Sequence, residues 1–121
     1  MSIRVQEYFR EDGSNPYRKW FDALDPQAAA KVTTALIRLA MGNTSNIKWF
    51  EGLGEYRIDW GPGYRIYLAQ DGAELIILLG GGTKRSQQAD IEQAKTLLTE
   101  YKSRKKAARK PAGTESKPKG R

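Results

Sequence analysis

Four polar side chains in this 121-residue chain have the types and spacing to do chemistry. Arg57 and Asp59 alternate with apolar residues before Gly61-Pro62-Gly63, and Arg65 and Tyr67 alternate with apolar residues after it. Residues two apart on a strand share one face of a sheet, so a hairpin would gather all four. Two guanidiniums and a phenol on one patch suit a phosphodiester, because arginine pairs its donors with phosphate oxygens and an aromatic ring stacks on a base.

Two further cations follow a third strand. Lys84 comes directly after Gly80-Gly81-Gly82-Thr83 and is predicted to reach the same open face, and Arg85 stands next to it. The glycine run lacks the G-x-x-x-x-G-K-[ST] spacing of a P-loop, so we expect it to provide close backbone approach instead. A purely structural interpretation of the polar patch stays open, because opposite charges across a hairpin stabilise it by about 0.2–1 kcal/mol without any ligand.

Composition excludes several kinds of site. The chain has no His and no Cys, so it offers no thiol nucleophile, no histidine acid–base pair and no Cys/His zinc site. Glu55 and Asp59 lack a third nearby carboxylate, and we expect neither a metal nor another cofactor. No apolar run approaches the roughly 18 residues of a membrane span, and the first residues do not form a secretory signal. We expect a cytoplasmic protein that does not contact membranes.

The elements that must position the patch are readable from periodicity and turn residues. A three-residue Gly-Pro-Gly loop keeps the apolar residues of the hairpin on one side, and it pairs Trp60 with Tyr64, Ile58 with Ile66, Asp59 with Arg65 and Arg57 with Tyr67. Asn15-Pro16 and Asp25-Pro26 are typical starts of two short helices. The full set predicts strands at 3–9, 55–60, 64–69 and 74–79, helices from Pro16, Pro26 and Ser86, and a loop at 47–50.

The order β-αα-β-β-β-α predicts an α+β fold with a small antiparallel sheet, an N-terminal helical hairpin, and helices against the sheet's apolar face. The net charge of +7 comes entirely from the end of the chain, where residues 102–121 hold nine Lys or Arg and one Glu. We therefore predict a domain over residues 1–101 and a basic, disordered tail over 102–121, whose first part, to about Lys110, can extend the last helix. The tail is either solubilising or a phosphate-binding arm.

The block Glu-Tyr-Arg-Ile-Asp-Trp-Gly-Pro-Gly-Tyr-Arg-Ile-Tyr at 55–67, with Leu-Leu-Gly-Gly-Gly-Thr-Lys at 78–84, resembles the RelE/ParE toxin superfamily. It is most similar to the addiction module killer branch of RelE/HigB-like toxins. The resemblance covers roughly residues 3–101. It implies the RelE-like fold and the toxin part of a type II toxin–antitoxin module, with a small helix-turn-helix antitoxin as partner.

The resemblance also implies an activity. RelE-like toxins are metal-independent endoribonucleases that cleave mRNA, commonly on the ribosome, by attack of the RNA 2′-hydroxyl on the adjacent phosphate. Arg65 matches the phosphate-binding arginine, Arg57 falls where these toxins have a lysine, and Lys84 falls near a second arginine. The expected catalytic residues are Arg57, Arg65, Tyr67 and Lys84, and the expected RNA-binding residues are Arg57, Arg65, Lys84 and Arg85. The chain has no match for the C-terminal tyrosine of RelE, so a ParE-like toxin that binds DNA gyrase is the alternative.

Overall fold

Two capped helices begin where the sequence predicts them. In the computed structural model, which describes residues 2–109, α1 spans Pro16–Asp22 and α2 spans Pro26–Ala40. The Asn15 side chain accepts a hydrogen bond from the Arg18 N–H at 2.9 Å, and Asp25 accepts one from the Ala28 N–H at 2.9 Å. Each cap satisfies a backbone donor that the first helical turn leaves free, and each proline occupies a first position that needs no donor.

The strands form one five-stranded sheet in the order β1-β5-β4-β3-β2. The sheet is mixed, because β1 pairs with β5 in parallel, whereas we predicted an antiparallel sheet throughout. The predicted loop at 47–50 is also wrong, since these residues form an edge strand. The strands are β1 (Arg4–Glu7), β2 (Ile47–Phe50), β3 (Leu53–Ile58), β4 (Tyr64–Gln70) and β5 (Leu75–Thr83), and the C-terminal helix α3 is Gln87–Arg109. Together they make a small α+β fold.

The β3–β4 hairpin has the predicted faces but a different register. Ile58 pairs with Tyr64 and Arg57 pairs with Arg65, two residues away from the predicted pairs. The connection is longer than three residues and is closed by hydrogen bonds from Trp60 N–H to Ile58 O and from Gly63 N–H to Trp60 O. A slip of two residues leaves every side chain on its own face. Arg57, Arg65 and Tyr67 therefore share a face as predicted, whereas the predicted pairing of Asp59 with Arg65 is wrong.

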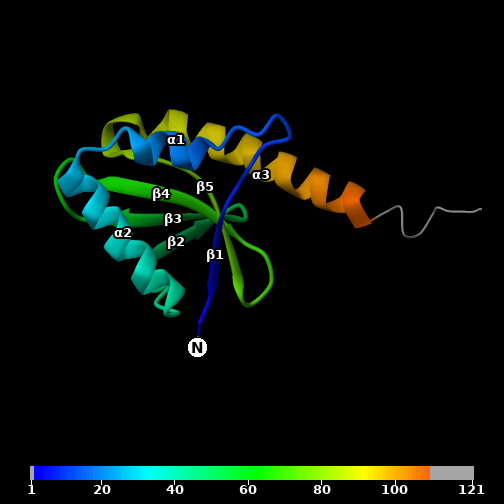
Figure 1. Ribbon diagram of the computed structural model, residues 1–121, viewed down its shortest axis with the longest axis horizontal. Coiled ribbons are helices and arrows are strands. Elements are labelled where there is room, and N and C mark those ends of the chain that lie inside the picture. The colour runs from blue at the N-terminus through cyan, green and yellow to red at the C-terminus, as the bar shows by residue number, and fades with distance from the viewer. Residues whose placement is uncertain (1, 110–121) are drawn as a thin grey trace, which may run out of the picture.

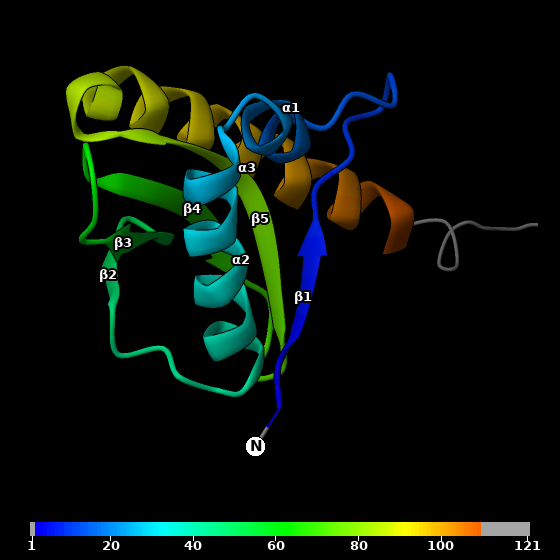
Figure 2. The ribbon, with the colours of Figure 1, turned by 60° about the vertical axis from the view of Figure 1, so that its left-hand side comes forward.

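Helices cover both faces of the sheet, whereas we predicted that they would cover only one (Figure 1; Figure 2). Strand β5 shows the reason, because it is apolar on both sides: Ile76 and Leu78 pack toward α1 and α2, while Ile77 and Leu79 pack toward α3. The predicted open face of the sheet is thus largely covered by α3. Only its end near the β3–β4 hairpin loop is left for polar groups.

The glycine run of β5 lets helices approach from opposite sides. A Cβ on Gly81 would lie 2.3 Å from the Trp20 ring of α1, and a Cβ on Gly82 would lie 1.8 Å from the Asp90 carboxylate of α3. A β-bulge precedes the run, because Leu68 pairs with Leu78 and Tyr67 pairs with Gly80, which leaves Leu79 as an extra residue. The predicted close backbone approach is confirmed.

Helix α3 continues through residues 102–109, the part of the tail that we expected could extend it. Residues 110–121 lie outside the described residues, so the expectation of disorder there stays a prediction. No helix in the described part of the chain is both long enough and apolar enough to span a membrane.

Candidate phosphate-binding site

A buried carboxylate lies at the centre of the polar patch. Glu55 on β3 has a side chain that is 1% exposed, and its neighbours on the same sheet face are Tyr67 and, further along, Arg57 and Arg65. From the sequence we considered Glu55 only as a metal ligand and did not predict its buried position in the patch. The spacing could have indicated it, because Glu55 precedes Arg57 by two residues in the same alternating pattern.

Three side chains donate hydrogen bonds to Glu55. Arg57 Nε lies 3.0 Å from Oε1, Tyr67 Oη lies 3.1 Å from Oε2, and Gln87 Nε2, from the first turn of α3, lies 2.7 Å from Oε2. Burial alone would raise the pKa of the Glu55 carboxyl, but the bonds from Gln87, Arg57 and Tyr67 outweigh it and hold the pKa below its ordinary value. Glu55 is therefore the fixed negative charge that orients the patch.

The two arginines differ in what they can reach. Arg57 is 49% exposed, so its terminal nitrogens face solvent while Nε stays on Glu55. Arg65 is only 10% exposed, and its Nε lies 3.5 Å from Glu55 Oε2 without making a hydrogen bond. This nitrogen is itself buried, so it faces the Glu55 carboxylate as an ion-pair partner.

The hairpin loop places Lys84 beside Arg65. The carbonyl of Gly63 accepts hydrogen bonds from Arg65 Nη1 at 2.8 Å and from the Lys84 backbone N–H at 2.9 Å. Gly63 has a φ of +79°, and a Cβ there would lie 3.2 Å from Arg65 Nη1 and 3.6 Å from Lys84 Cβ. Glycine is therefore required both by backbone conformation and by space. The backbone of Lys84 therefore lies close to Arg65, and the predicted reach of its ammonium to the patch stays a prediction.

The remaining predicted residues lie in different surroundings. Arg85 is exposed next to Lys84. Tyr67 is fully buried, and burial first, then the Glu55 carboxylate, raises the pKa of its phenol. This phenol donates to Glu55 and does not reach solvent, so it holds the carboxylate in place. Lys48 on β2 was not considered in sequence analysis, but it pairs with Glu55 across the strands and is exposed on the same face.

The described residues contain no cluster of three or more carboxylates that could hold a metal ion. The patch contributes positive charge, because Arg57, Lys84 and Arg85 are exposed and Arg65 is mostly buried next to Arg57.

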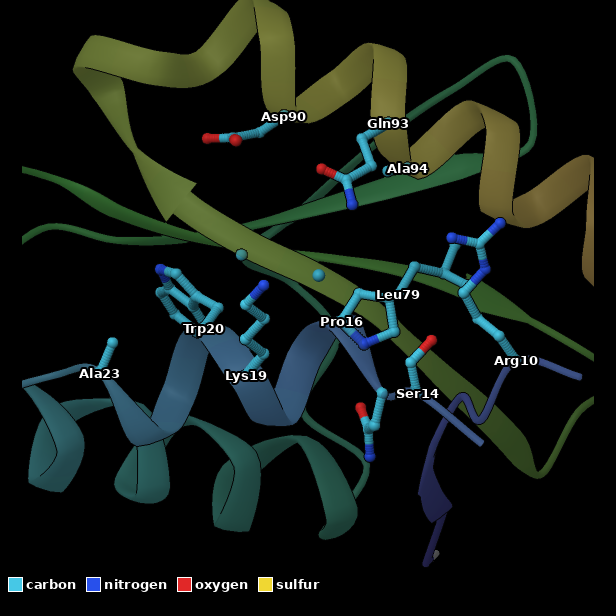
Figure 3. A pocket seen from close by; sticks show the side chains of 13 residues that line it. Arg10, Ser14, Pro16, Lys19, Trp20, Ala23, Leu79, Asp90, Gln93 and Ala94 are labelled. Atoms are coloured by element: carbon cyan, nitrogen blue, oxygen red, sulfur yellow. The ribbon is translucent and has the colours of Figure 1, made fainter. Parts of the chain in front are cut away.

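A separate groove lies between α1 and α3, at the edge of β5. It has a volume of about 540 Å³, and Figure 3 shows side chains of both helices pointing toward one another across the strand. Strand β1 pairs with β5 only over Leu75–Leu78, so beyond Leu78 no strand among the described residues covers this edge. Trp20 and Lys19 line one side of the groove, and Asp90 and Gln93 line the other.

A protein of Haemophilus influenzae is 43% identical to this chain over 86 residues, which cover 69% of this chain and 87% of that protein. The chain belongs to the family of that protein. This Haemophilus relative is described only as an uncharacterized protein, so family membership by itself assigns no activity. No protein-family model matches the sequence. The features that bear on the function of this family are therefore the cationic patch around Glu55 and the groove between α1 and α3.

Proposed function

We propose that the chain is the toxin of a type II toxin–antitoxin module, has a RelE-like fold, and acts as a metal-independent mRNA endoribonuclease. The observation that carries the proposal is the pair of neighbouring guanidiniums on one sheet face, the half-exposed Arg57 and the mostly buried Arg65. Both guanidiniums are held by one carboxylate, and Lys84 stands at the same hairpin loop. This arrangement supports an RNA phosphate as the ligand, in agreement with the resemblance of residues 55–67 to RelE-like toxins.

The proposed chemistry is attack of the RNA 2′-hydroxyl on the adjacent phosphate, which forms a 2′,3′-cyclic phosphate and releases the 5′-oxygen. Arg57 and Arg65 stabilise the charge that grows on the phosphate oxygens. Lys84 donates a proton to the leaving 5′-oxygen. The proton of the 2′-hydroxyl passes to a solvent water while the ribosome holds the attacking oxygen in line, because Glu55 and Tyr67 are buried and bonded to each other and do not accept it.

Arg57 gives the cleanest test of this proposal. Arg65→Gln would remove a buried cation and leave Glu55 without it, so lost activity could reflect lost stability. Arg57 is half-exposed, so Arg57→Gln should lower the melting temperature less than Arg65→Gln does, while it lowers cleavage by about 10²–10³-fold at a temperature where the variant is folded. The matched control is Arg4→Gln, which removes the same charge from β1, at the other edge of the sheet.

The experiment induces each variant in cells and records growth and the ends of mRNA fragments. The wild type and Arg4→Gln should stop growth and leave fragments with cyclic phosphate ends. Arg57→Gln and Lys84→Gln should permit growth and leave mRNA intact. Growth arrest by the wild type with intact mRNA would refute the endoribonuclease proposal.

A ParE-like toxin that acts by binding DNA gyrase is the second candidate. The burial of Tyr67 favours it, because a toxin that only binds a protein needs no proton carrier in the patch. In that case folded Arg57→Gln and Lys84→Gln would stay toxic, and DNA supercoiling in the poisoned cell would change.

The proposed partner is a small helix-turn-helix antitoxin encoded nearby. Two surfaces fit it: the cationic patch, and the groove between α1 and α3 that leaves the β5 edge uncovered. Co-expression with the neighbouring reading frame tests this directly. Lys19→Glu in the groove and Lys84→Glu in the patch then distinguish the surfaces by which variant loses co-purification. If the two products neither co-purify nor restore growth, the toxin–antitoxin proposal fails.

A further inference from the structure

The C-terminal turns of α3 have no core to cover. The buried residues of this helix are Ala94, Leu97 and Leu98, and no residue from Lys102 to Arg109 is fully buried. Figure 1 shows these turns extending past the sheet. Packing therefore does not explain why the helix continues here.

This part of the helix is strongly basic. Residues 102–109 include five cations and no acid: Lys102, Arg104, Lys105, Lys106 and Arg109. Cations favour the C-terminus of a helix, but the helix dipole acts only within the last turn. Like charges four residues apart, as in Lys102 with Lys106 and Lys105 with Arg109, repel each other. The run is thus electrostatically unfavourable for the helix alone and would be stabilised by a polyanion.

Four of these cations line one groove. A cavity of about 470 Å³ lies between the end of α3, the β2–β3 turn and the β4–β5 turn, and its lining includes Lys102, Lys105, Lys106 and Arg109. Lys102 Nζ lies 3.6 Å from the position that a Cβ would take on Gly52, so this glycine lets the lysine extend over the β2–β3 turn. Arg104 points elsewhere, donating to Tyr8 Oη and to the Phe9 carbonyl.

The acid in the groove lining is already neutralised. Asp71 accepts hydrogen bonds from Lys105 Nζ at 2.5 Å and 2.6 Å and another from Tyr101 Oη. Among the described residues, no ion pair engages Lys102, Lys106 or Arg109. Three positive charges are therefore available to a ligand.

We propose that this groove binds the phosphodiester backbone of RNA, as a second contact for the strand that the candidate site engages. The three available cations, Lys102, Lys106 and Arg109, are four and three residues apart along α3, so they are about 6 and 4.5 Å apart along the helix axis, a distance of one to two phosphate steps. The aliphatic lining residues Leu98 and Ala69 are buried, so the side chains that the groove presents to a ligand are mainly the cations and half-buried Tyr101.

The inference rests on the proposed function, but it concerns the opposite end of α3. Gln87 of the first turn contacts Glu55, whereas the first cation of the groove, Lys102, comes 15 residues later, about 22 Å along the axis. RNA bound at both places would therefore run along the helix. Binding at the groove and cleavage at the patch can be measured separately.

The test uses the full-length protein and a short, labelled single-stranded RNA, with affinity measured against salt concentration. Lys102→Gln combined with Lys106→Gln should weaken binding about tenfold at low salt. It should also reduce the slope of log affinity against log salt by about 1.4, because two phosphate contacts are lost. The control is Arg4→Gln on β1 with Lys19→Gln on α1, which removes the same charge away from Arg57 and should change affinity less than twofold.

Three outcomes would refute the proposal that this groove binds RNA. Equal weakening by both double variants would mean that only net charge matters. An unchanged affinity in the groove variant, with cleavage intact, would refute the groove but leave the proposed function standing. Competition by polyglutamate as effective as by unlabelled RNA would point to an acidic protein instead. Conversely, groove-dependent RNA binding by a protein that never cleaves RNA would support the groove and refute the endoribonuclease.

Discussion

At the level of single side chains, Glu55 accepts hydrogen bonds from Arg57, Tyr67 and Gln87 and lies within ion-pair distance of Arg65. Removing one partner of a buried ion pair costs about 3–5 kcal/mol, because the other charge stays buried. Glu55→Gln should therefore lower the free energy of unfolding by about 3 kcal/mol and the melting temperature by roughly 12 °C or more. Thermal melting followed by circular dichroism measures this.

Glu51→Gln is the matched control, since Glu51 is 70% exposed and its ion pair is with Lys95 at the surface. That pair should contribute less than about 1 kcal/mol. If the two variants melt at similar temperatures, Glu55 does not hold the patch together.

The lowered pKa of Glu55 gives the stability of the chain a defined dependence on pH. Its ordinary value is 4.5, and the folded value is lower. The unfolded chain therefore takes up this proton first as the pH falls, and the stabilising contribution is complete above about pH 4.5. It is lost as the pH drops through the folded pKa. The stability difference between wild type and Glu55→Gln should thus shrink below pH 4.5; a constant difference down to pH 2 would contradict this.

Tyr67→Phe separates a structural phenol from a catalytic one. The phenol donates one hydrogen bond to a buried carboxylate, so its loss should cost about 1.5–3 kcal/mol of stability. RNA cleavage by the folded variant should stay near the wild-type rate. A large loss of cleavage without a change in melting temperature would instead assign the proton transfer to Tyr67.

Alternation along the strands predicts which side chains share the patch but not how they pair. Arg57, Arg65 and Tyr67 were placed on one face correctly, since a slip of two residues preserves the face. The predicted pairing of Asp59 with Arg65 was wrong because the predicted and the observed register differ by two residues, and the alternation of polar and apolar residues fits both. Gln87 was not predictable at all, because its contact with Glu55 joins residues 32 apart in sequence and depends on how α3 crosses the sheet.

At the level of elements, the glycine run of β5 gives three neighbouring positions with different surroundings. A Cβ on Gly80 would have nothing within 4 Å, one on Gly82 would meet the flexible end of Asp90, and one on Gly81 would meet the Trp20 ring. Trp20 packs against Tyr17 and Tyr64, so its ring can move away only by losing these contacts. Gly81→Ala should therefore cost about 1–3 kcal/mol and Gly82→Ala less, while Gly80→Ala should be tolerated.

Chemical denaturation of the three variants measures the order. The Gly80 variant serves as the control for the general effect of replacing glycine by alanine in a strand. Equal stabilities would show that α1 does not press on Gly81.

The helices were predictable from local signals, and the layers were not. Asn15-Pro16 and Asp25-Pro26 mark helix starts through groups within three residues of each other, so the sequence shows them directly. Whether α3 joins the other helices or covers the opposite face depends on β5, whose apolar run at 75–79 allows burial on both sides. Strand β2 was missed because its residues do not alternate, and an edge strand needs only one partner.

At the level of the whole molecule, the middle of α3 buries apolar side chains, whereas its C-terminal turns do not. Leu97 and Leu98 are buried, whereas residues 102–109 contact the body mainly through polar groups such as Arg104 and Lys105. Amide protection should follow this gradient, because local opening costs less where little apolar surface is buried. Hydrogen exchange should be slow at 94–98 and at least tenfold faster at 103–109; uniform protection to Arg109 would contradict the assignment.

The single extra residue at the bulge fixes the phase of everything that follows it in β5. Because Leu79 has no partner of its own, Gly81 meets α1 and Gly82 meets α3. Gly81 pairs with Ile66, which packs toward α1 and α2, and Gly82 pairs with Arg65 of the patch. The extra residue therefore absorbs the mismatch between the two halves of β5, so that the apolar run before it and the glycine run after it each lie in phase with β4. Through this one residue, the backbone of Lys84 reaches Gly63 while the glycines face the helices that they admit.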